Sequence, residues 1–229
     1  ACSSMQSITC GKSYCGKDWI KNHRLIIIMY VLIVSRTQMS NGVCVGGIDE
    51  NTGDLIRLHN DRGGNLPSDA PYQIGDRWQM NVQPAWNARP FPHIEDRQTT
   101  PIKKIENIGV DGVIQFIRTH NMGARLATGD IRNTFQGKLI LEGTKNYISR
   151  NAIPQFSTQF WISDRDLVHR IQYGKHFYFY NNIRLKYVGF QECLDIIPRG
   201  TIIRLSLANW WDDGSGEDRC YLQLSGWYL

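Results

Sequence analysis

Residues 200–211, GTIIRLSLANWW, repeat the pattern of residues 75–86, GDRWQMNVQPAW, at a constant offset of 125 positions. Each stretch begins with glycine, ends with tryptophan and carries three alternating apolar residues, which are Ile203, Leu205 and Leu207 in one and Trp78, Met80 and Val82 in the other. Apolar residues at every second position are typical of a strand with one buried face. The same strand used twice predicts two copies of one small β domain. The alternative is that any two alternating strands that follow a glycine match in this way.

Short strands broken by turn residues extend in both directions from this repeat. Residues 43–48 and 55–59 flank a turn that ends at Gly53 and predict a β-hairpin. Further strand candidates in the second half are 138–141, 159–162, 177–180, 184–190, 201–207 and 220–224. Between the halves, apolar residues at helical spacing predict a single amphipathic helix, and they are Val110, Val113, Ile114 and Ile117.

These elements predict a mainly β fold with minor α content, made of two tandem OB-like small β-barrels joined by a short helical segment. About five strands with glycine-rich bends in each half suit an OB-fold and also permit an SH3-like barrel. We expect an N-terminal lead-in over residues 1–24, the first barrel over 25–108, a helical connector over 109–134 and the second barrel over 135–229.

The composition of the 229-residue chain is that of a globular protein, with 41% hydrophobic and 21% charged residues. It excludes a disordered tail, a collagen-like fibre and a coiled coil. The net charge of +5 is compatible with a polyanionic partner. Six cysteines are too few for a disulfide scaffold and indicate a reducing compartment. Four residues near the N-terminus have zinc-ligand chemistry, but their spacing matches no common zinc motif, so we expect a disordered lead-in there and no metal site: Cys2, Cys10, Cys15 and His23.

The apolar run of residues 25–34, LIIIMYVLIV, has the outline of a signal peptide because basic residues precede it. It lacks a small-residue cleavage site, and ten residues are half the length of a membrane span. Its β-branched side chains favour a buried strand. We therefore expect a cytoplasmic protein that makes no contact with a membrane.

The most informative local stretch for function is residues 175–190, KHFYFYNNIRLKYVGF, in which Asn181 and Asn182 favour a two-residue hairpin turn. That turn makes Phe177 face Lys186 and Phe179 face Arg184, so these four share one side of the sheet. Aromatic rings can stack on bases while the cations pair with phosphates, as single-stranded nucleic acid requires. The alternative is that both phenylalanines point into the barrel core while the cations reach out at its edge.

An acidic loop, residues 212–218, follows the pair Trp210 and Trp211. Its carboxylates would repel a phosphate backbone, so we expect a nucleic-acid path to avoid it. These carboxylates could hold a divalent cation, but a solvated hairpin tip is the preferred interpretation.

Signals for catalysis are few, because the chain lacks a Walker-type phosphate loop, HExxH, GxSxG and a glycine fingerprint. The best candidate is a metal-dependent nuclease site at Asp164, Asp166 and His169. The competing interpretation is a turn at Asp164 and a helix-surface pair of Asp166 with Arg170. We predict no catalytic residue, no metal site and no cofactor.

The chain resembles the bacterial dual OB-containing domain proteins over about residues 29–229. The first half carries the resemblance in SRTQMSNGVCVGGIDENTGDLIRL, and the second half carries it in FWISDRDLVHR, LKYVGFQE, IPRGTIIRLSLANWW and CYLQLSGWY. The resemblance implies two OB-folds in one chain. It also implies that Arg36 and Arg57, which occupy matching positions in the family pattern, are candidate phosphate contacts. Leu58 replaces the proline that usually follows the Ile-Arg pair.

The expected function is binding of single-stranded DNA or RNA, or of a nucleotide, through Phe177, Phe179, Arg184 and Lys186, together with Arg36 and Arg57. The first alternative is a protein–protein adaptor in a bacterial defence-type assembly. The second alternative is the metal-dependent nuclease.

Overall fold

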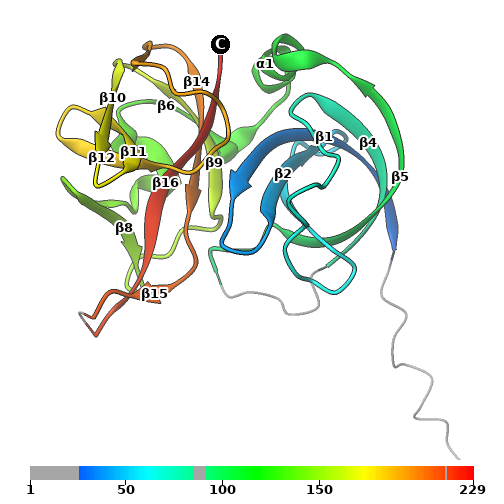
Figure 1. Ribbon diagram of the computed structural model, residues 1–229, viewed down its shortest axis with the longest axis horizontal. Coiled ribbons are helices and arrows are strands. Elements are labelled where there is room, and N and C mark those ends of the chain that lie inside the picture. The colour runs from blue at the N-terminus through cyan, green and yellow to red at the C-terminus, as the bar shows by residue number, and fades with distance from the viewer. Residues whose placement is uncertain (1–25, 85–90, 215) are drawn as a thin grey trace, which may run out of the picture.

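The first half of the chain forms a closed five-stranded barrel in the computed structural model, which describes residues 26–84, 91–214 and 216–229 (Figure 1). Its strands are β1 (Ile27–Gln38), β2 (Val43–Asp49), β3 (Leu55–His59), β4 (Asp76–Pro84) and β5 (Asp96–Asn107). The strand order is β1-β2-β3-β5-β4, and β4 closes the barrel by pairing antiparallel with β1. β3 and β5 pair in parallel, with Arg57 opposite Asp96. This is the five-stranded barrel arrangement that an OB-fold requires.

The second half forms a strongly coiled sheet beside that barrel (Figure 1). Its main path has the order β13-β10-β11-β12-β16-β14-β9-β6, and β7, β8 and β15 pair off this path. The strands are β6 (Leu126–Gly129), β7 (Ile140–Glu142), β8 (Lys145–Ser149), β9 (Thr158–Ser163), β10 (Leu167–Gln172), β11 (Lys175–Tyr180), β12 (Ile183–Tyr187), β13 (Ile196–Ile197), β14 (Ile202–Leu207), β15 (Trp211–Asp212) and β16 (Asp218–Tyr228). β12 and β16 pair in parallel, as β3 and β5 do in the first half.

The predicted repeat is confirmed, because β4 and β14 occupy the same place in the two halves. β4 lies between β1 and β5, and β14 lies between β9 and β16, all antiparallel. Gly75 and Gly200, the first residues of the repeat, have φ values of 89° and 82°. Their N–H groups donate to carbonyls of the neighbouring strand, to Ile33 O at 2.9 Å and to Ser163 O at 2.8 Å. Only glycine adopts this left-handed conformation readily, which is why each copy starts with it. Trp86 lies outside the described residues.

One helix and two 3-10 segments connect the halves: α1 (Gly109–Thr119), η1 (Gly123–Arg125) and η2 (Ile131–Gly137). Val113 and Ile117 of α1 are fully buried in an apolar cluster that includes Leu32 of the first barrel and Phe160 of the second sheet. The predicted helix is therefore confirmed, although Val110 at its start is exposed. The predicted connector, 109–134, also contains β6, which pairs in parallel with β9.

Direct polar contacts also hold the two halves together. The carboxylate of Glu95 is buried and accepts hydrogen bonds from the backbone N–H groups of Ser157 at 2.8 Å and Thr158 at 3.1 Å. Arg125 forms an ion pair with the same carboxylate at 2.8 Å. The hydroxyl of Tyr228 donates to the carbonyl of Val34. A buried charge with this many partners requires one fixed arrangement of the two halves.

Two local predictions need correction, and one strand was missed. The apolar run 25–34 is buried only from Val31, because Ile26, Ile27 and Ile28 at its start are exposed. β5 was not predicted, since its outer half is solvent-exposed and its apolar and basic residues follow no clean alternation. The segment after Asp166 is the strand β10, so Asp166 and Arg170 do not form a helix-surface pair.

The proposed N-terminal lead-in and the group of Cys2, Cys10, Cys15 and His23 lie outside the described residues. Cys44, Cys193 and Cys220 are free thiols. In the described part of the chain, helices are too short or too polar to cross a membrane.

Candidate functional site

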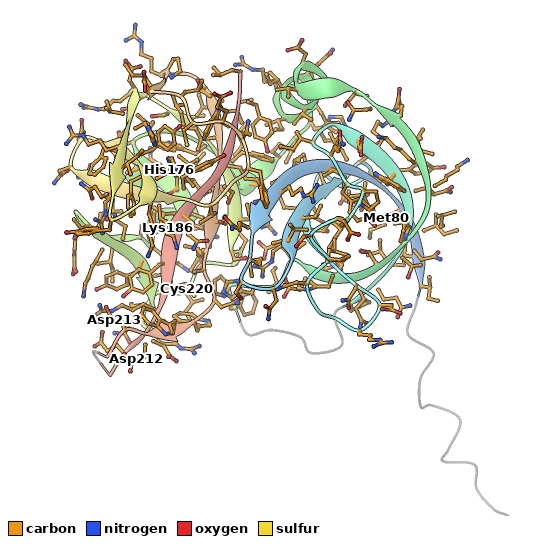
Figure 2. The ribbon with its side chains drawn as sticks, in the orientation of Figure 1. Met80, His176, Lys186, Asp212, Asp213 and Cys220 are labelled. Carbon is orange, nitrogen blue, oxygen red and sulfur yellow. The ribbon has the colours of Figure 1, made fainter. Side chains whose placement is uncertain are left out.

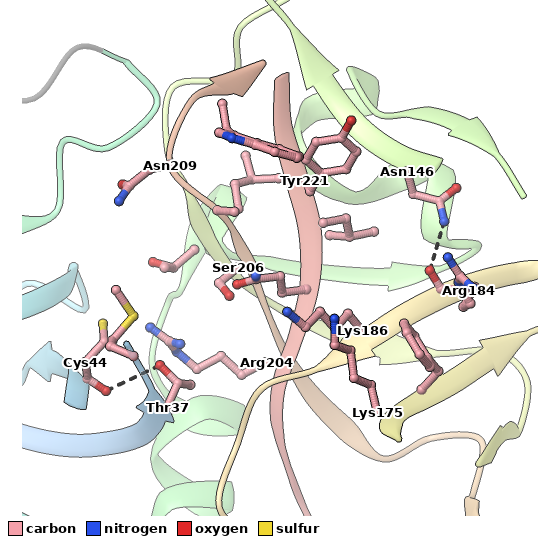
Figure 3. A pocket seen from close by; sticks show the side chains of 18 of the residues that line it. Thr37, Cys44, Asn146, Lys175, Arg184, Lys186, Arg204, Ser206, Asn209 and Tyr221 are labelled. Atoms are coloured by element: carbon pink, nitrogen blue, oxygen red, sulfur yellow. Dashed lines mark hydrogen bonds between the residues drawn. The ribbon is translucent and has the colours of Figure 1, made fainter. Parts of the chain in front are cut away.

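A cleft of about 740 Å³ lies between the first barrel and the sheet of the second half (Figure 3). Strands β1, β2 and β3 form one wall through residues that include Thr37, Cys44 and Arg57. Strands β11, β12, β14 and β16 form the opposite wall and the floor. This volume lies within the range of ~300–1,000 Å³ typical of sites for small ligands.

The cleft is strongly basic. Six Lys and Arg side chains line it, against one carboxylate, that of Asp213: Arg57, Lys145, Lys175, Arg184, Lys186 and Arg204. The carboxylate is already occupied, because Lys145 Nζ lies 3.0 Å away and the Tyr221 hydroxyl donates to it at 2.8 Å. Walls of one charge sign around a concave surface concentrate anions from solution.

The hairpin of β11 and β12 supplies three of the six cations of the cleft, Lys175, Arg184 and Lys186. Its register places Phe177 opposite Lys186 and Phe179 opposite Arg184, as the two-residue turn predicted. Asn181 in that turn has a φ of 54°, the left-handed conformation that asparagine tolerates. The opposite face of the hairpin packs into the core of the second sheet through Tyr178, Tyr180, Ile183 and Leu185. Alternation along the strands therefore points the cations away from the core and toward the cleft.

Lys175 and Lys186 are exposed, and the salt bridges of the described residues include neither of them. Arg184 is held more firmly. Its guanidinium lies 4.5 Å from the centre of the Phe177 ring and donates to Gln172 Oε1 at 2.9 Å. Such stacking orients the planar guanidinium.

Arg204 and Arg57 form the floor of the cleft. Arg204 is only 2% exposed, and its Nε has no hydrogen-bond partner among the described residues. Burial lowers the pKa of Arg204, and the neighbouring charge of Arg57 acts in the same direction. Gly46 makes room for this guanidinium, because a Cβ there would lie 2.5 Å from Arg204 Nη2. Figure 3 shows Arg204 extending from β14 toward Thr37 and Cys44.

Arg57 has one acidic partner. Its Nε donates to Asp96 Oδ1 at 2.6 Å, while its Nη2 has no hydrogen-bond partner among the described residues. Burial lowers the pKa of Arg57, but the acidic groups around it, Asp96 first, together outweigh burial, so the pKa of Arg57 is raised. Two buried guanidinium groups with unused donors therefore share the floor. A buried cation without a full set of partners is costly, and an anionic ligand would supply the missing acceptors.

Aromatic rings line the end of the cleft nearest the acidic loop. The Trp211 side chain is 60% exposed, and its ring centroid lies 6.1 Å from that of Tyr221. Phe177 is 7% exposed because Arg184 covers it. An exposed indole beside cations is a surface on which a base can stack.

Four of the six residues selected from the sequence line this cleft: Phe177, Arg184, Lys186 and Arg57. Phe179 is half-buried under Arg170, whose guanidinium lies 5.1 Å from its ring centre, and it does not line the cleft. Arg36 also lies outside the lining, where it donates to the Ser68 carbonyl. Neither Phe177 nor Phe179 is an exposed stacking surface, because an arginine side chain covers each ring. Neither belongs to the main core cluster of the second half.

Sequence reasoning missed Lys175, Lys145 and Arg204. Lys175 was detectable, because strand alternation places it on the same face as Phe177. Lys145 and Arg204 belong to other strands, β8 and β14, and only the packed sheet brings them to the hairpin.

One residue of the acidic loop, Asp213, lines the cleft, and its charge is paired with Lys145. Asp212 instead accepts hydrogen bonds from the N–H groups of Gly214 and Gly216 at 2.9 and 3.1 Å, within the loop itself. The loop therefore presents less free negative charge to the cleft than its sequence suggests.

The three nuclease candidates have separate partners. Asp164 accepts from the Tyr180 hydroxyl at 2.7 Å, and Asp166 accepts from the backbone N–H of Arg199 at 2.7 Å. His169 Nε2 lies 2.9 Å from His176 Nδ1. Among the described residues, the group of potential metal ligands that contains His169 includes neither Asp164 nor Asp166.

A family model described as a dual OB-containing domain matches residues 29–227. Neither a curated protein nor a solved structure matches the chain.

Proposed function

Because the chain belongs to the dual OB-containing domain family, we propose that it binds single-stranded nucleic acid, or a nucleotide, in the cleft between its two halves. The family supports a binding role of the OB type, and the chemistry of the cleft indicates the kind of ligand. OB-folds bind oligonucleotides and oligosaccharides through strand faces and adjoining loops.

The observation that carries this proposal is the convergence of six cations and an exposed tryptophan on one cleft. A polyanion with flat, apolar rings matches both features, because phosphates pair with the cations while bases stack on the indole. A neutral oligosaccharide could offer hydroxyl acceptors to the floor guanidinium groups of Arg204 and Arg57, but it carries no negative charge to balance these buried cations. Nucleic acid therefore fits better than sugar.

The exposed and buried cations have different roles in this proposal. Lys175 and Lys186 stand at the rim, where they attract the ligand and contribute a salt-dependent part of the affinity. Arg204 stands at the floor, where a phosphate would receive charge-assisted hydrogen bonds in a setting protected from water.

Titration of the protein with a short single-stranded oligonucleotide at several salt concentrations tests the proposal, with tryptophan fluorescence as the readout. The logarithm of the association constant should fall with the logarithm of salt concentration by about 0.7 per phosphate contacted. Trp211→Ala should weaken binding by the value of one stacked base, ~1–3 kcal/mol. A protein–protein adaptor would show no oligonucleotide binding even at low salt, and that result would replace the proposal with the adaptor function.

A further inference from the structure

A second group of chemically reactive side chains lies on the other face of the β10–β11 hairpin. His169 of β10, His176 of β11 and Cys193 each offer one potential metal-ligand atom, and these atoms all lie within 4.8 Å of one another. Along β11, His176 alternates with the cleft residues Lys175 and Phe177, so it faces away from the cleft. Figure 2 labels His176 and Lys186, which belong to neighbouring strands of the second sheet.

Strand register explains why the two histidines meet. His169 pairs with Tyr178, and His176 lies two residues before Tyr178 on the same strand. Diagonal neighbours of this kind share one face of the sheet and are within reach of each other's side chains. The imidazole rings are stacked, with centroids 5.1 Å apart.

The segment after β12 brings the thiol to the same place. The Tyr178 hydroxyl accepts from the N–H of Leu194 at 3.0 Å and donates to its carbonyl at 3.0 Å. The N–H of His169 donates to the carbonyl of Asp195 at 2.8 Å. Cys193 is therefore carried by a segment that is hydrogen-bonded to both strands of the hairpin.

The two distances that join His176 Nδ1 to the other ligand atoms are close to those of a zinc site. His169 Nε2 lies 2.9 Å from His176 Nδ1, and Cys193 Sγ lies 3.3 Å from the same nitrogen. Zinc bonds of ~2.0–2.1 Å to nitrogen and ~2.3 Å to sulfur, at tetrahedral angles, separate two nitrogens by about 3.3 Å and nitrogen from sulfur by about 3.6 Å. The two separations that involve His176 are within a few tenths of an ångström of this geometry, and the ligand atoms of His169 and Cys193 lie within 4.8 Å of each other.

We propose that His169, His176 and Cys193 form a binding site for a divalent transition-metal ion of the zinc type. Two imidazoles and a thiolate favour zinc over magnesium or calcium, which prefer oxygen ligands. Three protein ligands leave a fourth position, and the exposure of His176 opens that position to solvent. Sequence spacing does not reveal the group, since six and sixteen residues separate its members.

Cobalt titration of the full chain, stripped of metal with a chelator, provides the test. A single Co²⁺ should bind per chain and produce a thiolate-to-cobalt charge-transfer band. Cys193→Ser should remove that band, and His169→Gln should weaken Co²⁺ binding by more than the ~10–100-fold that an outer hydrogen-bond partner is worth. The matched control is Cys44→Ser, which replaces a half-buried free thiol in the first barrel and should retain the band.

A further control addresses the cysteines outside the described residues. The triple variant Cys2→Ser, Cys10→Ser and Cys15→Ser should keep the band. Retention of the band in Cys193→Ser, or its loss in the triple variant, would overturn the proposal. The unmodified protein gives an independent measurement, because Zn²⁺ should protect Cys193 from alkylation while Cys44 stays reactive. Equal alkylation of Cys193 with and without Zn²⁺ would mean that the three side chains form only a hydrogen-bonded group.

Discussion

Removal of the two rim lysines is the sharpest perturbation of the proposed nucleic-acid site. The double variant Lys175→Ala and Lys186→Ala deletes two exposed cations of the cleft that the salt bridges of the described residues do not include. Each lysine is free to pair with a phosphate without first breaking an internal contact. Its full electrostatic contribution should therefore be lost on substitution.

Counterion release sets the size of the effect. Each phosphate contact on a single strand contributes about 0.7 to the slope of log K against log salt, so two lost contacts should flatten the slope by about 1.4. Extrapolated from 1 M to about 0.1 M salt, the same two contacts correspond to a loss of affinity of about 25-fold. At high salt the variant and the original protein should converge.

The assay is fluorescence anisotropy of a labelled single-stranded oligonucleotide at four or more salt concentrations. The matched control is Lys103→Ala with Arg118→Ala, which removes the same charge from exposed positions on β5 and α1, outside the cleft. The control should keep the slope, and both variants should keep the melting temperature. An equal change of slope in both double variants would mean that net charge, rather than the cleft, governs binding.

Three further predictions concern two buried side chains and one glycine with a positive φ. Arg204→Met should abolish most oligonucleotide binding. It should also raise the free energy of unfolding, measured by urea denaturation, by ~1–3 kcal/mol, because an apolar side chain replaces a buried guanidinium with an unpaired Nε. A loss of stability would show that Arg204 is a structural group. Gly200→Ala should lower the free energy of unfolding by ~1–2 kcal/mol because the φ of Gly200 is +82°; steric contact is not the cause, since a Cβ would meet nothing within 4 Å. Gly200→Asn should lower it by less. Equal losses for both variants would argue against backbone conformation as the cause. Burial raises the pKa of Cys220 from 9.0 to about 12, so its contribution to stability is complete below pH 9 and is lost as the pH rises toward 12. Cys220→Ala should therefore lessen the decline of the free energy of unfolding at alkaline pH, measured by urea denaturation. An unchanged decline would show that ionisation of Cys220 is not its cause.

Local sequence patterns were sufficient to predict the strands whose buried face is marked by alternating apolar residues or by a turn. The Asn181–Asn182 turn determined the register of the β11–β12 hairpin, and alternation then determined its core face. The glycine-led repeat identified β4 and β14 as equivalent strands. β5 escaped detection because much of it is exposed, so no apolar alternation marks it.

The sites themselves arise only in three dimensions. By itself, the sequence determined two OB-like halves and the hairpin residues Phe177, Arg184 and Lys186, because turn chemistry and strand alternation act over a few residues. Tertiary structure decided that Arg57 and Arg204, 147 positions apart, share a cleft floor, and that Cys193 meets the two histidines. The physical reason is that strand order and the docking of the two halves depend on apolar burial summed over the whole core. Docking of the two halves then brings together charged residues that are far apart in the sequence.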